Sequence, residues 1–526
     1  MPDSRLWWQD AVCYQIYVRS FADSDGDGVG DLAGITSRLP YLADLGVDAV
    51  WLTPFYTSPQ ADHGYDVADY RDVDPLFGRL DDFDAMLAAA HDLGLRVIVD
   101  VVPNHSSSAH AWFEAALAAR PGTPERARYL FRDGRDNGTP PNNWQSVFGG
   151  PAWTQVPDGQ WYLHLFDATQ PDFDWDNPEV GDEFESVLRF WLDRGVDGFR
   201  IDVAHGLFKE PGLPDVEAEQ NVGGIDEAMS ELDRPYWDQP GVHDVYRRWH
   251  DVIASYPGDR MAVAEAWVSS AESMARYVRP DELQQAFNFH WLEAEWSADE
   301  FRRVVDETFA AVDPVGAAAT WVLSNHDVDR HVSRFGGGSV GLARARAATA
   351  MMLALPGSAY VYAGEELGLP QADVPAEARQ DPTWRRGAGI GRDGCRVPMP
   401  WSGTASPYGF GPDGATPWLP QPDSWAALSV EAQQGDEAST LELYRRLIAT
   451  RRELLPQLGR RVAFVDTRDD VVALRRDGLI CVVNCGDEVF DLTALADPGK
   501  LVVATGHTAD VRNGSLPPDT AAWLHA

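Results

Sequence analysis

Acidic and histidine side chains occur at four points of this chain where a short apolar run ends. Any one of these polar residues could cap a strand or form a turn. Together they indicate one functional rim, because the carboxyl ends of the strands in a parallel barrel face the same side. The four segments are Asp100-Val-Val-Pro-Asn-His105, Gly198-Phe-Arg-Ile-Asp202, Val263-Ala-Glu-Ala-Trp267 and Ser324-Asn-His-Asp327.

Asp202 and Glu265 are two carboxyl groups whose surroundings should give them different pKa values, and Arg200 belongs to the surroundings of Asp202. Residues two apart on a strand face the same side, so Arg200 should lie beside Asp202 and lower its pKa, as a nucleophile requires. Glu265 stands between two alanines and near Trp267. Apolar surroundings raise a carboxyl pKa, as a general acid requires. Two such groups are the apparatus of glycoside hydrolysis, and a separation of ~5–5.5 Å would retain the anomeric configuration.

Eight short, β-branched apolar runs alternate with longer helical patterns and would position these residues. Alternation of this kind predicts parallel strands joined by crossover helices. We therefore predict an α/β protein with a (β/α)₈ TIM barrel, and a doubly wound open sheet is the alternative that the pattern leaves open. The predicted strands are Tyr14–Val18, Val47–Thr53, Leu95–Val102, Val196–Val203, Met261–Trp267, Ala286–Trp291, Thr320–Ser324 and Ser358–Ala363.

Two regions depart from the alternation of strand and helix. Residues 105–171 are rich in proline, glycine, asparagine and tryptophan without a clear period, and such a long irregular segment usually carries function. After residue 456 the pattern changes to short strands separated by turns. We assign residues 1–104 and 172–456 to the barrel, 105–171 to a domain inserted after strand three, and 457–526 to a C-terminal β-sandwich.

The composition limits the partners of the chain. A net charge of −39 disfavours nucleic acid and anionic membranes, whereas a neutral sugar is not repelled. Lys209 and Lys500 are the only lysines, which fits either composition bias or salt tolerance. No apolar run approaches the ~20 residues of a membrane span, and the N-terminus lacks a signal-peptide pattern, so we expect a cytoplasmic protein. We expect it to be a monomer or a homodimer. The four cysteines have no metal spacing and should be reduced.

The four rim segments resemble the signature regions of the α-amylase family of glycoside hydrolases, and the resemblance covers nearly the whole chain. Three further segments are similar to the branch of oligo-1,6-glucosidases and α-glucosidases, namely Trp8–Phe21, Asn143–Gly150 and Gln170–Asp174. Several separate motifs in the right order make this a specific match. The resemblance implies the barrel architecture and a sugar substrate.

The resemblance also implies roles for six residues of the rim. Asp202 matches the nucleophile, Glu265 the acid/base, and Asp327 a third carboxylate that holds sugar hydroxyls while the ring distorts. The subsite where cleavage occurs is lined in the family by residues that match His105, Arg200 and His326.

The segment Ala61-Asp-His-Gly-Tyr-Asp66 looks like the family loop after strand two. Tyr65 would stack its ring on the bound glucose, because the C–H face of a sugar suits an aromatic plane. Asp62 and Arg396 would hold hydroxyls at the non-reducing end, which predicts a closed pocket and an exo-acting enzyme. The alternatives are core packing for Tyr65 and a salt bridge that braces the loops for Asp62 and Arg396.

An acidic loop near the N-terminus predicts a structural calcium site. Oxygen ligands at alternating positions, with a backbone carbonyl at the seventh, imitate a calcium loop, although position twelve is Ala33 instead of glutamate. A solvated acidic turn is the alternative. No organic cofactor is expected. The candidate ligands are Asp23, Asp25, Asp27, Val29 and Asp31.

Gly337-Gly-Ser339-Val-Gly341 matches the elbow of serine hydrolases, but that motif needs a strand before it and a helix after it. A polar stretch precedes it here. We therefore interpret the segment as a flexible loop near the rim and Ser339 as no nucleophile.

Three functions compete. The first is a retaining, exo-acting α-glucosidase that releases glucose from short oligosaccharides of the maltose or isomaltose type. Val203 resembles the choice of oligo-1,6-glucosidases, although the following Ala204-His-Gly206 departs from their pattern. The second is an α-glucosyl transferase or isomerase, of the sucrose isomerase or trehalose synthase type, on the same scaffold. The third is a non-catalytic barrel such as a transporter heavy chain, which the three retained acids and the missing membrane anchor disfavour.

Overall fold

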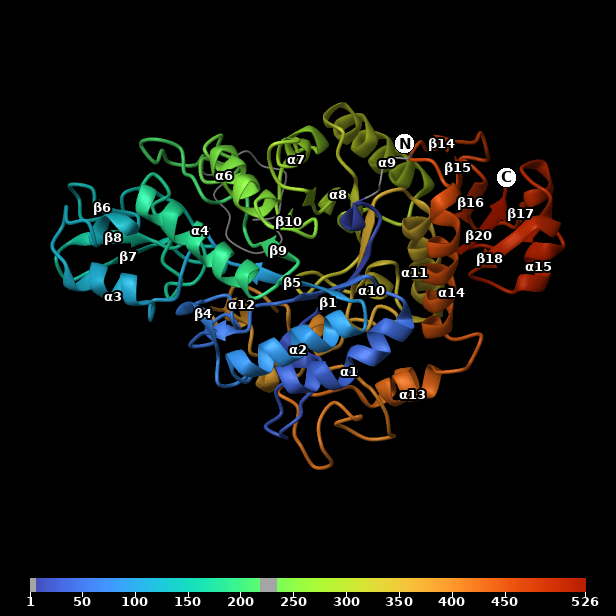
Figure 1. Ribbon diagram of the computed structural model, residues 1–526, viewed down its shortest axis with the longest axis horizontal. Helices are drawn as coiled ribbons and strands as arrows, with labels where there is room; N and C mark the ends of the chain where they lie inside the picture. The colour runs from blue at the N-terminus through green and yellow to red at the C-terminus, as the bar shows by residue number, and fades with distance from the viewer. Residues whose placement is uncertain (1–5, 218–233) are drawn as a thin grey trace.

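A sheet of eight parallel strands forms the centre of the molecule (Figure 1), and the computed structural model describes residues 6–217 and 234–526. Neighbouring strands follow the order β11-β10-β9-β5-β2-β1-β13-β12. The barrel strand that comes first in the sequence, β1, therefore pairs with the one that comes last, β13. The strands are β1 (Val12–Ile16), β2 (Ala49–Leu52), β5 (Arg96–Val101), β9 (Gly198–Ile201), β10 (Met261–Ala264), β11 (Gln285–Ala286), β12 (Thr320–Val322) and β13 (Ser358–Tyr362).

The sheet closes into a barrel, which confirms the predicted fold and excludes the doubly wound alternative. The backbone N–H of Asn288, just after β11, donates to the carbonyl of Thr320 in β12 at 3.1 Å and bridges the remaining seam. Every residue of β1, β2, β9, β10, β12 and β13 is buried. Such strands read as continuous apolar runs because one face packs inside the barrel and the other lies under helices.

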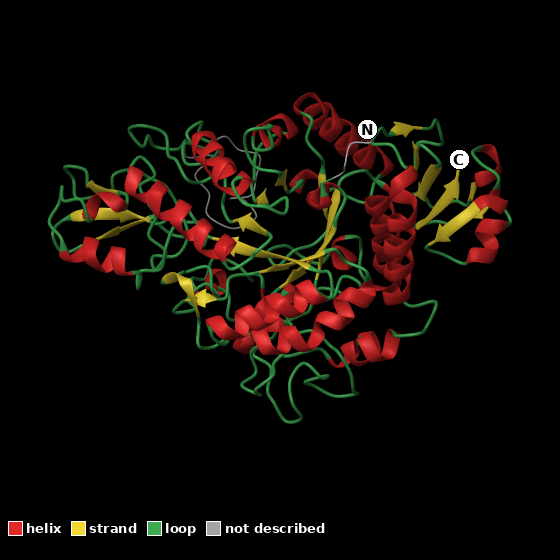
Figure 2. Ribbon diagram, viewed as in Figure 1, coloured by secondary structure: helices red, strands yellow, loops and turns green. Residues whose placement is uncertain are grey.

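Helices surround the barrel (Figure 2), and several begin at the polar caps that the sequence provides. The side chain of Asn177, directly before Pro178, accepts a hydrogen bond from the N–H of Glu179 and caps α4. Ser297 caps α9 in the same way. The long helices are α1 (Leu32–Leu45), α2 (Leu80–Asp92), α4 (Pro178–Asp193), α6 (Val242–Ala254), α9 (Ala298–Val312), α11 (Gly338–Ala354) and α14 (Thr440–Leu454).

The run Ala286–Trp291 was predicted as one strand, and this is wrong for most of its length. The strand β11 ends at Ala286, and helix α8 (Phe289–Glu293) follows. The side chain of Asn288 accepts from the N–H of Trp291 and so caps the helix. The expected loop around Ser339 is also wrong, because Ser339 lies in the first turn of α11, after α10 (His331–Arg334) and with no strand directly before it.

The chain between β5 and α4 forms the insertion, seen in cyan at the left of Figure 1. It carries helix α3 (Ala111–Ala118) and a three-stranded antiparallel sheet of order β6-β8-β7. An aromatic and apolar cluster joins it to the segment after β9, because Val203 and Trp237 pack with side chains of the insertion. The sheet consists of β6 (Phe131–Asp133), β7 (Trp153–Gln155) and β8 (Gln160–Leu163).

The C-terminal part is the predicted β-sandwich. An antiparallel sheet of order β14-β15-β16-β20-β18 is accompanied by the pair β17-β19. It packs on the barrel through α11, where the indole N–H of Trp523 donates to the carbonyl of Ala350 at 2.9 Å. The strands are β14 (Ala463–Phe464), β15 (Val471–Arg476), β16 (Leu479–Asn484), β17 (Phe490–Asp491), β18 (Leu501–Ala504), β19 (Ser515–Leu516) and β20 (Thr520–His525).

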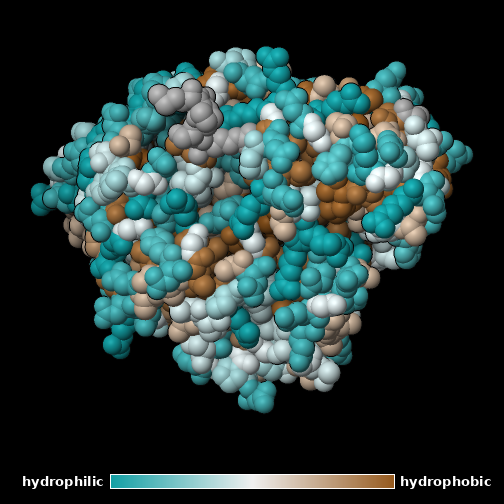
Figure 3. Space-filling view, turned by 45° about the vertical axis from the view of Figure 1, so that its right-hand side comes forward, coloured by the Kyte–Doolittle hydropathy of each residue, from teal (hydrophilic) through white to brown (hydrophobic). Residues whose placement is uncertain are grey.

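Hydrophilic residues predominate on the face shown in Figure 3, with smaller hydrophobic areas between them, as the large excess of acidic residues predicts. None of the helices in residues 6–217 and 234–526 is long and apolar enough to cross a bilayer. All four cysteines are free thiols, in agreement with the expectation from their spacing.

Lys209 joins the insertion to the barrel. Its ammonium group lies 2.9 Å from Asp172 Oδ2 and 3.0 Å from Asn104 Oδ1, and it also donates to the carbonyl of Gly206. These partners come from the end of the insertion, the end of β5 and the loop after β9. Burial lowers the pKa of Lys209, and the charge of Asp172 opposes this effect. Lys209 therefore supplies the positive charge that the buried carboxylate of Asp172 needs.

We expect Lys209→Met to destabilise the protein by ~3–5 kcal/mol, because the substitution leaves Asp172 buried without its counter-ion. Chemical denaturation followed by tryptophan fluorescence measures the change. Lys500→Met removes the other lysine of the chain at an exposed position and is the matched control. Equal stability of the two variants would contradict the structural role of Lys209.

Candidate active site

A narrow pocket lies at the C-terminal ends of the barrel strands, where the four polar segments meet. Its volume is about 70 Å³, and one enclosed water needs about 10–15 Å³. The space therefore suits a single small ring better than a chain of sugars. The lining residues are Asp62, Tyr65, His105, Val147, Phe148, Phe166, Asp202, Val203, His205, Trp237, Glu265, Trp267, His326, Asp327 and Arg392.

Two carboxyl groups share one guanidinium at the base of this pocket. Arg200 Nη1 lies 2.6 Å from Asp202 Oδ1, and its Nη2 lies 2.6 Å from Glu265 Oε2. The backbone N–H of Val203 also donates to Glu265 Oε2 at 3.0 Å. Asp202 follows β9 and Glu265 follows the neighbouring β10, so adjacent strands bring the pair together.

The expectation that Arg200 lowers the pKa of Asp202 below its usual value is wrong for the protein without substrate. Burial raises the pKa of Asp202 well above the usual value, Arg200 opposes this, and the charges of Glu265 and Asp100 add to the rise. The guanidinium acts in the predicted direction, but it is shared among several acids. Burial and the neighbouring acids therefore outweigh the effect of Arg200 on the pKa of Asp202.

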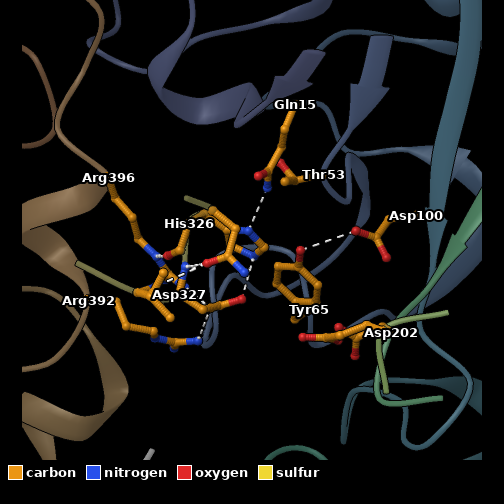
Figure 4. Close-up of polar contacts among 12 residues, drawn as sticks. Gln15, Thr53, Tyr65, Asp100, Asp202, His326, Asp327, Arg392 and Arg396 are labelled. Carbon is orange, nitrogen blue, oxygen red and sulfur yellow. Dashed lines mark hydrogen bonds and ion pairs between the residues drawn. The ribbon is translucent and has the colours of Figure 1, made fainter. Parts of the chain in front are cut away.

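Asp100 lies behind the pair and anchors it. Its Oδ1 is 2.9 Å from Arg200 Nη1, and its Oδ2 accepts from the hydroxyl of Tyr65 at 3.2 Å (Figure 4). Burial raises the pKa of Asp100 to about 7, against the opposing effect of Arg200. Although Asp100 belongs to a motif, sequence reasoning gave it no role, because a strand-end carboxylate does not show which partner it will meet.

Asp327 is held in the opposite electrostatic state. Its Oδ1 lies 2.9 Å from Arg392 Nη1 and 2.9 Å from Arg396 Nη2, and its Oδ2 lies 3.3 Å from His326 Nε2. Burial raises the pKa of Asp327, but His326, Arg392 and Arg396 outweigh this and bring it below the usual range. Asp327 therefore stays ionised and can accept hydrogen bonds from hydroxyl groups.

The three pocket histidines are neutral. Burial lowers the pKa of His105 to about 3, that of His205 to about 4 and that of His326 well below its usual value. The amide nitrogen of Gln15 lies 2.7 Å from His326 Nδ1 (Figure 4), and donation from Gln15 leaves the ring proton on Nε2. A neutral ring with a fixed proton offers one N–H to a ligand without adding charge.

Tyr65 is packed in the core and also lines the pocket, where its predicted stacking on glucose stays a prediction. Its ring stacks on His326 with centroids 5.3 Å apart and planes 9° apart, and the same residue lines the pocket. One face of the Tyr65 ring is therefore packed against His326, and the rest of the side chain borders the cavity. Its hydroxyl bond to Asp100 fixes the plane of the ring.

Asp62 lines the pocket, as its expected role in binding hydroxyls requires, but the placement of Arg396 there needs correction. Arg396 is completely buried and does not line the pocket, and its Nε donates to the carbonyl of His326 at 2.8 Å. The arginine that reaches Asp62 is Arg392, whose Nη2 lies 2.9 Å from Asp62 Oδ1. The two arginines are four residues apart and flank the short 3₁₀ helix Asp393–Cys395. No periodic pattern distinguishes them, so sequence reasoning missed Arg392.

Aromatic side chains that were not predicted complete the pocket. Phe148 and Phe166 come from the insertion, Trp237 from the segment after β9, and Trp267 from the end of β10. The ring of Phe148 also lies under the guanidinium of Arg392, with 5.1 Å to its centroid. Of these four aromatic residues, only Phe148 and Trp267 lie in segments that resemble the family motifs, so the sequence could have indicated only those two.

The acidic loop brings three of its four aspartates together. Carboxylate oxygens of Asp23, Asp25 and Asp27 lie within 4.8 Å of one another. Asp31 instead caps α1, where it accepts from the N–H of Gly34. The backbone N–H of Val29 donates to Asp27 Oδ1, which shapes the turn.

The family of the chain follows from comparison with known proteins. The family model for the α-amylase catalytic domain matches residues 15–458 of the sequence. The chain belongs to the α-amylase family of glycoside hydrolases. Its eight-stranded barrel and the carboxyl pair at the strand ends are thereby set within a family of sugar-cleaving enzymes.

Three curated relatives show the range of activities at this distance. A probable α-glucosidase of Rhizobium meliloti is 40% identical over 93% of this chain and 90% of its own length. A trehalose-6-phosphate hydrolase of Escherichia coli is 38% identical over 85% of this chain and 84% of its own. An oligo-1,6-glucosidase of Parageobacillus thermoglucosidasius is 35% identical over the same shares of the two chains.

Two solved structures of proteins with other named activities are also similar to this chain. The α-glucosyl transfer enzyme XgtA is similar with a TM-score of 0.89 and 39% identity over 99% of this chain and 100% of its own. The trehalulose synthase MutB of Pseudomonas mesoacidophila has a TM-score of 0.89 and 32% identity over the same shares.

The pair formed by Asp62 and Arg392 predicts a pH dependence. Burial raises the pKa of Asp62 to about 6, and Arg392 is the strongest opposing charge. If ionised Asp62 binds sugar, kcat/KM for glycoside hydrolysis falls as the pH drops through about 6. In Arg392→Met the pKa of Asp62 rises further, so the fall begins at higher pH.

A pH profile of kcat/KM measures this shift. Arg386→Met is the matched control, because Arg386 belongs to the same loop and pairs with Asp167 at 3.0 Å. An acidic limb that stays at the same pH in Arg392→Met would contradict the assignment to Asp62.

Proposed function

We propose that the protein is a retaining, exo-acting α-glucosidase that releases terminal glucose from short oligosaccharides of the maltose or isomaltose type. The observation that carries this proposal is the carboxyl pair of Asp202 and Glu265 on one guanidinium, at the base of a pocket of about 70 Å³. The relatives that cleave α-glucosides support the substrate class.

The closeness of the pair supports retention. Inverting enzymes need ~6.5–9.5 Å between their carboxyl groups to admit a water, whereas retaining enzymes need ~5–5.5 Å. Asp202 and Glu265 contact adjacent nitrogens of the same guanidinium at 2.6 Å each. This shared contact supports the shorter separation, in which one group acts on the anomeric carbon directly.

In the first step, Glu265 gives its proton to the glycosidic oxygen while the carboxylate of Asp202 attacks the anomeric carbon. This step requires Glu265 to be protonated and Asp202 to be ionised when substrate is bound. In the second step, Glu265 takes a proton from water, and the resulting hydroxide displaces Asp202 from the sugar. Ionised Asp327 accepts hydroxyl hydrogen bonds throughout.

A glucosyl transferase or isomerase is the second candidate. The similar structures of a glucosyl transfer enzyme and a trehalulose synthase favour it, as does the aromatic lining of the pocket. Aromatic side chains reduce access of water to a covalent intermediate, and a second sugar would then replace water as the acceptor. The balance between water and sugar decides which product forms.

Product analysis separates the two candidates. The protein is incubated with maltose, isomaltose, sucrose and trehalose, and products and anomers are followed by proton NMR. Initial release of α-glucose from maltose or isomaltose supports the glucosidase. Rearranged or lengthened saccharides as the main product support the transferase or isomerase.

The roles of the pair predict different responses to substitution. Asp202→Asn should abolish cleavage, because the nucleophile is lost. Glu265→Gln should lower kcat by about 10²–10⁴ for maltose, and by less for p-nitrophenyl α-glucoside, whose leaving group needs no proton. Glu272→Gln at an exposed position of helix α7 (Ala271–Arg276) is the control. Equal losses of Glu265→Gln on both substrates would remove the acid role.

We also propose that Ca²⁺ binds at Asp23, Asp25 and Asp27. Grouped carboxylate oxygens are the ligands that this ion prefers. Burial raises the pKa of Asp27, and the charges of Asp25 and Asp23 contribute to the rise, so a bound cation would relieve their repulsion. Asp31 is engaged as a helix cap and takes no direct part.

Calcium should raise the thermal midpoint relative to EDTA by about 2–4 °C. Asp25→Asn should remove this difference, because it takes away one ligand charge. Asp81→Asn, in the first turn of α2, is the control and should keep the difference. A midpoint that is the same with calcium and with EDTA would contradict a bound ion.

A further inference from the structure

The turn that follows the nucleophile carries a histidine that the proposed mechanism does not use. His205 lines the catalytic pocket and is only 3% exposed. It belongs to Ala204-His-Gly206, the segment in which the sequence departs from the pattern of oligo-1,6-glucosidases. The φ of Val203, at the start of this turn, is +45°, a value that β-branched residues rarely adopt. Such a conformation persists only where the surroundings fix it, and it is common at functional sites.

The same turn packs against the acid/base. The backbone N–H of Val203 donates to Glu265 Oε2 at 3.0 Å, and that of Ala204 donates to the backbone carbonyl of Glu265 at 2.8 Å. In the proposed mechanism Glu265 gives its proton to the glycosidic oxygen, so the leaving group must lie beside Glu265. His205 therefore borders the side of the pocket on which the leaving group departs.

The ring of Trp237 lies against the ring of His205. Their centroids are 4.6 Å apart, and Trp237 also lines the pocket. The next residue, Asp238, fixes the pair from behind, because its backbone N–H donates to the carbonyl of His205 at 2.8 Å. The carboxylate of Asp238 accepts in turn from the hydroxyl of Tyr277 at 2.6 Å and from that of Ser273. The two rings are thus held in place before a ligand binds.

Both rings have a buried polar atom without a partner. Nδ1 of His205 and Nε1 of Trp237 make no hydrogen bond within residues 6–217 and 234–526. Of the pocket-lining residues in these ranges, only these two have such an atom. Buried polar groups of native proteins are nearly always hydrogen-bonded. Two adjacent exceptions in one pocket therefore indicate a partner that comes from outside the chain.

The chemistry of the two rings specifies that partner. Burial lowers the pKa of His205 to about 4, and the charge of Asp238 is the strongest opposing effect, so the imidazole is neutral at neutral pH. A neutral imidazole has one unprotonated nitrogen that accepts a hydrogen bond, whereas an indole N–H only donates. An uncharged donor and an uncharged acceptor are complementary to hydroxyl groups, which both accept and donate.

We propose that His205 and Trp237 select the leaving group by binding hydroxyl groups of the leaving sugar. These hydroxyls accept from Trp237 Nε1 and donate to the unprotonated nitrogen of His205. The inference rests on the proposed α-glucosidase function and specifies which leaving groups the enzyme favours. A leaving sugar gains hydrogen bonds that a methyl group cannot form, so disaccharides are cleaved in preference to methyl α-glucoside.

The test compares kcat/KM for a disaccharide of glucose, in whichever linkage the protein cleaves, with kcat/KM for methyl α-glucoside. The ratio of the two values is the readout, because general damage to the pocket lowers both. His205→Leu and Trp237→Phe should each lower this ratio about three- to tenfold, which is the effect expected of one hydrogen bond. Trp237→Phe retains an aromatic ring beside His205 and removes the N–H.

Two further sets of variants separate a hydrogen bond from packing. The amides of His205→Asn and His205→Gln place polar atoms near the positions of Nδ1 and Nε2, so at least one of them should restore most of the ratio. Trp425→Phe is the matched control and should leave the ratio unchanged. Within the described residues, Trp425 Nε1 is also buried without a partner, but Trp425 lies in the 3₁₀ helix Asp423–Leu428 and does not line the pocket.

Three results would overturn the inference. The first is an unchanged ratio in both His205→Leu and Trp237→Phe. The second is a loss in Trp425→Phe as large as that in Trp237→Phe, and the third is failure of both amide variants to restore the ratio. In all three cases the unaltered protein still releases glucose, so the α-glucosidase function stands. Absence of cleavage of every substrate by the unaltered protein would instead remove the function and the inference together.

Discussion

The Arg200 guanidinium lies among three buried carboxyl groups, and the active site depends on this arrangement. Asp100, Asp202 and Glu265 each contact it at 2.6–2.9 Å. Buried charges are costly unless they are paired, and three acids around one cation cannot all be ionised without a large electrostatic cost. Burial raises the pKa of Asp100 and of Asp202, and the neighbouring acids add to the rise in each case.

Charge is distributed unequally between the two sides of the pocket. The side of Asp202 is rich in acids, whereas Asp327 faces two arginines and the neutral His326. The pKa of Asp202 is therefore raised and that of Asp327 lowered, although both groups are buried carboxyls. The same residue type thus serves either proton chemistry or hydroxyl binding, according to the number of cations that contact it.

Much of this arrangement could be predicted from the sequence. Parallel strands bury both faces, so their apolar runs are easily recognised, and seven of the eight were found with small errors at their ends, whereas the run Ala286–Trp291 is mostly not a strand. Residues directly after those strands, such as Asp202 and Glu265, could be placed because the barrel geometry brings strand ends together. The turn at Asn288 was missed because a capping side chain overrides the apolar character of the residues that follow it.

The remaining errors concern charge and irregular loops. The pKa of Asp202 depends on how many acids share Arg200, and no spacing along the chain shows that number. Arg392 and Arg396 flank one short 3₁₀ turn, and only the folded backbone decides which of them is completely buried. The aromatic residues of the pocket come from the insertion and other distant segments, so their convergence is a tertiary property.

The pairing of β1 with β13 has a consequence for synthesis of the protein. Val12 is the register partner of Ala359, so the barrel cannot close before most of the chain has left the ribosome. Contacts between such distant segments form slowly, because closing a long loop costs entropy. The nascent chain must keep its apolar strands from associating with other chains during this interval. The strong negative charge of the acidic surface is suited to that task, since it keeps incomplete chains apart until the last strand arrives.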